Sequence, residues 1–144
     1  MLKLPYTKTS QAIKGYSEST IAKKERADCV VRAIASASGM EYDKAHTFVS
    51  EKFNRKSRGG TPRFIPVMNS IGKLNRKKIT PVSVKNGTKS LTVNSFSKVY
   101  NKGTYILNVK GHAFTIKDGN VIGNVEDAIK TRKILKAAWK IGTN

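Results

Sequence analysis

The chain of 144 residues contains a single cysteine, Cys29. One thiol forms neither an internal disulfide framework nor a cysteine-rich zinc site, so a hydrophobic core has to stabilise the fold. A chain of this length with 38% hydrophobic residues supports one such core. We therefore expect one folded domain that binds no metal and needs no cofactor.

The first half of the chain has a helical pattern after a polar lead-in. Residues 1–27 contain few apolar anchors and are expected to form a basic N-terminal arm. Asp28 is placed to cap a helix over 29–38. Apolar residues at helical spacing predict two further helices, over 41–54 and 64–72.

The second half has a different period. Alternating apolar residues predict strands, and turn residues separate them, over 79–84, 104–109, 112–116 and a return through 121–122. A short helix is expected over 93–100, and a basic amphipathic helix over 128–141, with Trp139 on its apolar face. Helices followed by an antiparallel sheet predict an α+β fold, with 28–144 as one domain.

Three residues in a fixed order point to a chemistry. Cys29 lies in the first turn of a predicted helix, His112 opens a predicted strand, and Asn124 follows. This is the chain order of a cysteine-nucleophile hydrolase. The alternative is that Cys29 is a small buried hydrophobic residue.

The physics of thiol activation favours pairing Cys29 with His112. A thiol with a pKa of about 8.5 is only a few per cent ionised at pH 7. A helix N-terminus supplies about 0.3–1 kcal/mol toward ionisation, whereas an imidazolium about 4 Å away supplies up to about 4 kcal/mol. The ring also needs an acceptor for its other nitrogen, for which Asn124 is the first choice and Asp127 the second. The Asp28 carboxylate is expected to turn toward the amides of the first helical turn.

Two motifs resemble a known family. The run DCVVRAIA, which contains Cys29, resembles the nucleophile helix of papain-like proteins of phage and bacterial genomes, and GHAFTIKDG, which contains His112, resembles their histidine hairpin. The resemblance covers residues 27–124. It implies a papain-like fold, in which an N-terminal helical half bearing Cys29 packs on a small antiparallel sheet bearing His112. It also implies a thiol protease or amidase of phage origin that acts on a peptide or protein by acyl transfer.

The resemblance is incomplete at the oxyanion hole. Such an enzyme would use the Cys29 amide and one upstream donor. Papain-like peptidases place a glutamine a few residues before the nucleophile, but the only glutamine here is Gln11, far upstream. Lys23 or Lys24 is expected to serve as a cationic substitute, and Lys23 is the one assigned. The missing glutamine leaves open a non-catalytic protein on the same fold.

The charge suggests other partners. Lys and Arg outnumber Asp and Glu by 28 to 9, a net charge of +19, which attracts polyanions by counterion release. The residues assigned to a surface for nucleic acid or another polyanion are Arg55, Lys56, Arg58, Arg76, Lys77, Lys78, Lys133 and Lys136. The alternative function is therefore a basic virion or nucleic-acid-associated structural protein, with viral structural proteins as further partners. Because no apolar run is long enough for a membrane span or a secretory signal, we expect the host cytoplasm or a virion.

Overall fold

The computed structural model describes residues 3–142. The first half of the chain is a short strand followed by helices: β1 (Tyr6–Lys8), α1 (Thr9–Ala12), α2 (Thr20–Lys24), α3 (Cys29–Ser38), α4 (Tyr42–Lys52) and α5 (Phe64–Ile71). The second half consists mainly of strands: β2 (Lys73–Leu74), β3 (Lys77–Val82), β4 (Lys85–Asn86), β5 (Lys89–Ser90), β6 (Thr104–Val109), β7 (His112–Lys117), β8 (Asn120–Gly123) and β9 (Leu135–Ile141). Two short helices interrupt these strands, α6 (Val93–Val99) and α7 (Val125–Ile129).

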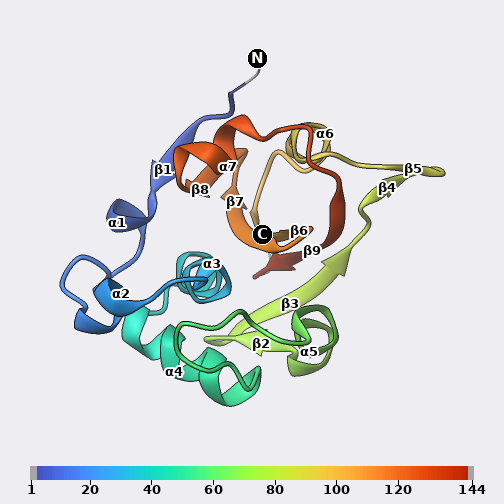
Figure 1. Ribbon diagram of the computed structural model, residues 1–144. Coiled ribbons are helices and arrows are strands. Elements are labelled where there is room, and N and C mark those ends of the chain that lie inside the picture. Colours follow the sequence, from blue (N-terminus) through green and yellow to red (C-terminus); the bar gives the residue numbers. More distant parts are fainter. Residues whose placement is uncertain (1–2, 143–144) are drawn as a thin grey trace.

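Seven strands form one sheet in the order β1-β8-β7-β6-β9-β3-β2, while β4 and β5 pair separately. Every pair in the large sheet is antiparallel except β1 with β8. Figure 1 shows the sheet strongly curved, with α3, α4 and α5 gathered on one side of it and α6 on the other. The predicted α+β class and the predicted hairpin of β6 and β7 are confirmed.

The core has two parts, which the strands separate. On β6, Ile106 packs with the cluster formed by α3, α4 and α5, whereas Tyr105 and Leu107 pack with the cluster around α6. The α3 helix is apolar on nearly all sides, as expected of a helix enclosed by other elements. It ends at Gly39, whose φ of 80° is accessible to glycine at little cost.

A buried polar contact fixes α3 against β7. The Thr115 hydroxyl donates to the Ala33 carbonyl at 2.8 Å and accepts from the Ser36 hydroxyl at 2.8 Å. Thr115 is completely buried. Since Cys29 begins α3 and His112 begins β7, this contact sets the relative position of the two residues.

The helix predicted over 128–141 is wrong. Its second half is β9, which lies in the middle of the sheet between β6 and β3. A bulge at Lys136 turns Leu135 toward the α6 cluster, while Trp139 and Ile141 pack with the α3 cluster. A strand buried on both faces loses its alternation, and the bulge gives the apolar residues a helix-like spacing.

The N-terminal residues are also better integrated than the predicted arm over 1–27. The β1 strand pairs with β8, and the Leu4 amide donates to the Ala128 carbonyl at 2.9 Å. Ile13, just after α1, is 4% exposed. Main-chain pairing at a sheet edge requires few apolar side chains, so composition did not reveal it.

We expect Thr115→Val to lower the free energy of unfolding by about 1–2 kcal/mol, because valine keeps the shape but removes the hydroxyl that joins α3 to β7. Urea denaturation monitored by tryptophan fluorescence measures the change. Thr47→Val is the matched control, since the exposed Thr47 hydroxyl bonds only within α4, and it should stay within about 0.5 kcal/mol of the parent protein. Equal effects of the two substitutions would contradict a structural role for the contact.

Candidate active site

Cys29 is the first residue of α3 and is partly buried. The His112 ring and the Ala113 backbone amide both lie beside its sulfur and lower the pKa of the thiol. Cys29 and His112 also line a cavity of about 400 Å³ that extends toward Gly60 and Thr61. The structure therefore brings together the two residues that the sequence singled out, at the edge of an open cleft.

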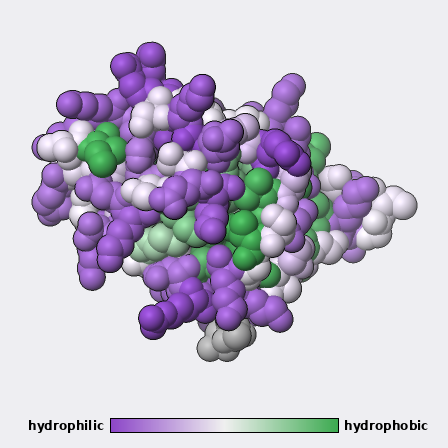
Figure 2. Space-filling view, turned by 90° about the horizontal axis from the view of Figure 1, so that it is seen from below, coloured by the Kyte–Doolittle hydropathy of each residue, from purple (hydrophilic) through white to green (hydrophobic). Residues whose placement is uncertain are grey.

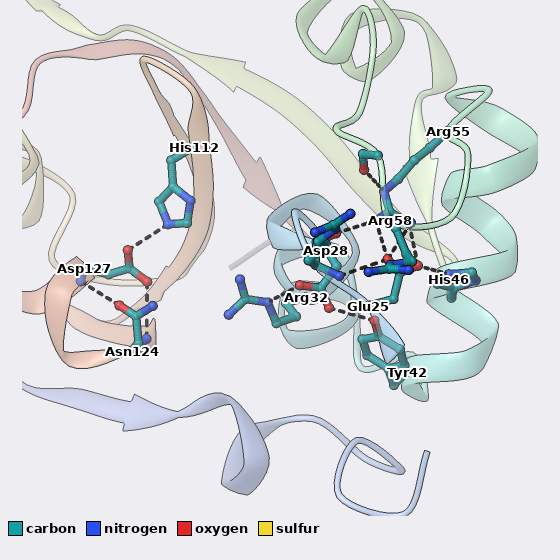
Figure 3. A network of polar contacts seen from close by, with 12 residues as sticks. Glu25, Asp28, Arg32, Tyr42, His46, Arg55, Arg58, His112, Asn124 and Asp127 are labelled. Carbon is teal, nitrogen blue, oxygen red and sulfur yellow. Dashed lines mark hydrogen bonds and ion pairs between the residues drawn. The ribbon is translucent and has the colours of Figure 1, made fainter. Parts of the chain in front are cut away.

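Asp127, rather than Asn124, holds the ring of His112. The distance between His112 Nε2 and Asp127 Oδ1 is 2.7 Å (Figure 3). Because Nε2 is engaged by the carboxylate, Nδ1 is left to face the sulfur. Asn124 caps α7 instead. Its side-chain oxygen accepts from the Asp127 backbone amide at 3.1 Å, and the Asn124 backbone amide donates to Asp127 Oδ2 at 3.2 Å. The second choice from sequence is thus the ring's partner, and Asn124 positions that partner.

The Asp127 carboxylate is confined on its other side by Gly123. A β-carbon at position 123 would collide with Asp127 Oδ2. The Asp127 side chain is only 8% exposed, so it has little room to move aside. Glycine at the end of β8 therefore allows the carboxylate to approach the backbone and still reach His112.

The contacts between thiol and ring favour the charged form of each. Burial opposes ionisation of Cys29, but the hydrogen bonds from His112 and Ala113, helped by the charges of His112 and Arg32, hold the pKa of the thiol below its ordinary value. The hydrogen bond to Asp127, followed by the one to Cys29, raises the pKa of His112 to about 9. The two contacts therefore stabilise the thiolate and the imidazolium relative to the neutral thiol and ring.

Asp28 does not cap α3 with its side chain, contrary to the sequence-based expectation. Its carboxylate accepts from Arg32 Nε at 3.1 Å and from the Tyr42 hydroxyl at 2.7 Å. Burial, together with the bond to Asp28, raises the pKa of Tyr42, so the phenol remains a donor. The negative charge beside Cys29 is thereby paired with Arg32.

Arg32 is the cation that the structure places beside the thiol. It lies one turn after Cys29 on α3 and lines the same cavities as Cys29 and His112. Its side chain is 23% exposed, and Figure 3 shows the guanidinium extending toward the side of the site that carries His112 and Asp127. Lys23, the cation assigned from sequence, is exposed on α2 and lines neither cavity.

A buried ion cluster fixes the segment that leads into α3. The Glu25 carboxylate accepts two bonds from Arg55, at 3.0 and 2.9 Å, and one from the Arg58 amide at 2.7 Å, and it also contacts His46 Nε2. The Glu25 and Arg55 side chains are 2% and 1% exposed. Burial opposes ionisation of Glu25, but these bonds lower its pKa to about 2. The cluster ties the segment before α3 to the loop after α4, which forms part of the cleft.

Arg55 is consequently unavailable to a polyanion, which corrects its assignment from sequence. The other assigned residues are exposed, and they are Lys56, Arg58, Arg76, Lys77, Lys78, Lys133 and Lys136. They occur in the loop after α4, around the β2–β3 turn and around the start of β9. Figure 2 views the molecule from the side of α4 and α5 and shows hydrophilic residues over most of this face, with apolar residues between them. The positive charge is therefore distributed over several parts of the chain.

No protein-family model, curated protein or solved structure matches this chain. Within residues 3–142, no group of three or more His, Cys, Asp and Glu side chains is arranged to hold a metal ion. In the same range, no helix has both the length and the apolar character that a membrane crossing requires.

Sequence reasoning did not identify Arg32, Glu25 or Arg55 as parts of the site. For Arg32 a signal exists, because a residue three positions after Cys29 shares its face of a helix. For Glu25 and Arg55 we find none, because their pairing depends on a loop whose path the sequence pattern does not predict.

Asp127→Asn should bring the pKa of His112 down from about 9 toward its ordinary 6.5, because the bond to Asp127 is the largest cause of the rise. NMR titration of the imidazole protons measures this pKa. Asn124→Ala is the control: it loses the side-chain cap, at a cost of about 1 kcal/mol, but keeps the main-chain amide that donates to Asp127 Oδ2, so the His112 pKa should stay near that of the parent. Equal pKa changes in both variants would contradict a direct role for Asp127.

Glu25→Gln should lower the free energy of unfolding at pH 7 by about 3 kcal/mol, because it leaves the buried Arg55 charge uncompensated. The folded-state pKa of Glu25, about 2, lies below its ordinary 4.5. The stabilisation is therefore complete above pH 4.5 and is lost as the pH falls toward 2. Guanidinium denaturation across this range should show the parent and the variant converging. Glu126→Gln, at an exposed ion pair, should differ from the parent by under about 0.5 kcal/mol at every pH.

Proposed function

We propose that this protein is a papain-like cysteine hydrolase that cleaves peptide or amide bonds. The observation that carries the proposal is the contact between Cys29 at the start of α3 and His112 at the start of β7, with the ring held by Asp127. A cysteine at a helix N-terminus beside a carboxylate-oriented histidine is an activated nucleophile. The packing of the cysteine helix on an antiparallel sheet that bears the histidine supports the papain-like assignment.

In the acylation step, the Cys29 thiolate attacks the substrate carbonyl carbon and forms a C–S bond. The imidazolium of His112 donates its Nδ1 proton to the amine nitrogen as the C–N bond breaks. Asp127 keeps the ring in place through Nε2 during this transfer. The products of the step are a thioester on Cys29, a released amine and a neutral imidazole.

In the deacylation step, His112 accepts a proton from water as the water oxygen attacks the thioester carbonyl. The C–S bond then breaks, the acid is released, and the thiolate and imidazolium are restored. Proton transfer by a positioned histidine typically contributes about 10²–10⁴-fold to the rate. The high pKa of His112 matches the first step, in which the ring must begin protonated.

The oxyanion formed in both steps needs donors close to the sulfur. The Cys29 backbone amide, at the start of α3, has no intrahelical acceptor and is the first donor. Arg32 is the second, since it lines the same cleft and its link to Asp28 restrains it. A charged donor partly shielded from water stabilises developing negative charge more strongly than an exposed one, so Arg32 takes the role that Lys23 was assigned.

Alkylation by iodoacetamide tests the proposal. Because Cys29 is the only cysteine, mass spectrometry of the whole protein reports its labelling. We expect rapid labelling at about pH 6.5, where an ordinary thiol is almost fully protonated, and at least a tenfold loss in His112→Ala. His46→Gln is the control, since glutamine retains a donor for Glu25 and residue 46 lies outside the cleft.

Two outcomes of this experiment oppose the proposal. Labelling that is equally fast in His112→Ala would exclude the pair as the source of reactivity. A thiol that reacts no faster than free cysteine in the parent protein would instead favour a non-catalytic, basic protein that binds polyanions.

A further inference from the structure

A second cleft adjoins the site on the side of His112. This cavity, of about 220 Å³, is lined by His112 and Asp127 but not by Cys29. Three lysines line it as well, Lys110 from the β6–β7 turn and Lys130 and Lys133 from the segment after α7. We call this cavity the lysine cleft. Val93, Val109 and Phe114 form an apolar wall of the cleft, and Asn124 and Glu126 complete its lining.

The charges of the lysine cleft do not cancel. Glu126 pairs with Lys130 at 3.5 Å, and the Asp127 carboxylate is engaged by His112 and Asn124. Within residues 3–142, the two remaining lysines of the cleft form no ion pair. The cleft therefore presents an excess of positive charge directly beside the histidine.

A larger cavity, of about 810 Å³, continues from the lysine cleft and shares Lys130 and Lys133 with it. It adds Arg132 and Asn94. The side-chain oxygen of Asn94 is buried and has no hydrogen-bond partner among the described residues.

The mechanism assigns this side of the site to one part of the substrate. His112 protonates the departing amine, so the segment that leaves with the amine passes beside His112 into the lysine cleft. The acyl segment lies over Cys29, in the cleft of Gly60 and Thr61, which contains no lysine. The Thr61 hydroxyl there is also buried without a partner among the described residues.

We propose that the lysine cleft binds an acidic side chain on the amine side of the bond to be cleaved, with Lys110 and Lys133 as its specificity-determining residues. The inference rests on the proposed hydrolase function, and it names the substrate class as an acidic peptide. A carboxylate fits because the cleft combines unpaired ammonium groups with an apolar wall, and its volume admits a side chain but not a folded partner.

Protection of Cys29 from iodoacetamide tests this inference. The competitors are blocked alanine hexapeptides that carry a single Glu, Gln or Lys, placed at each position in turn. At one position, we expect the Glu peptide to protect at about fivefold lower concentration than the isosteric Gln peptide, and the Lys peptide to protect least. Lys110→Gln/Lys133→Gln should abolish the preference for Glu over Gln. Lys77→Gln/Lys78→Gln changes the net charge equally outside the cleft and should retain the preference.

The outcomes separate this inference from the proposed function. Equal protection by Glu and Gln peptides at all positions, or no protection by any peptide, would overturn the acidic subsite. An equal loss of preference in both double variants would also overturn it, because the overall charge would then be the cause. Protection is a ratio of labelling rates, so it can be measured even if His112→Ala shows that the thiol is not activated.

Discussion

The position of α3 on β7 is the constraint on which the site depends. Cys29 belongs to α3 and His112 belongs to β7. The two side chains can meet only if the helix packs on the strand in one register. Small side chains such as Ala33 let the two backbones approach, and the Thr115 hydroxyl, bonded to the helix, selects the register. A slip of one helical turn would move the sulfur by about 5.4 Å and separate it from the ring.

The carboxylates of this basic chain have specific partners near the site. The Asp127 carboxylate hydrogen-bonds the His112 ring, and Asp28 pairs with Arg32. Glu25 pairs with Arg55, in the loop that borders the cleft. With 28 basic residues against 9 acidic ones, most cations have no carboxylate available to them. The buried acidic residues therefore organise the candidate site, while the excess of lysines lies on the surface.

Local sequence patterns correctly predicted the helices and strands whose structure depends mainly on their own residues. Asp28 and Gly39 bound a helix that forms as expected, and the alternation on either side of Lys110 gives the β6–β7 hairpin. The hydrophobic pattern gave the wrong secondary structure where tertiary packing determines it. The Lys136 bulge and burial on both faces made β9 resemble a helix.

The same distinction applies to the candidate site. Cys29 and His112 were identifiable because thiols and imidazoles are rare in this chain. Their partners were harder to identify, because a carboxamide and a carboxylate three residues apart are both plausible for the ring. Only the path of the chain into α7 decides between Asn124 and Asp127. The pairing of Glu25 with Arg55 likewise depends on loop geometry.

The place of β9 in the sheet has a consequence for biosynthesis. This strand follows every other element in the chain but lies between β6 and β3, so β3 and the α5 helix beside it can join the β6–β7 hairpin only after β9 has emerged. A ribosome releases the cysteine helix α3 well before this central strand. The nascent polypeptide thus carries the Cys29 thiol without its histidine until His112, and then Asp127, have been synthesised.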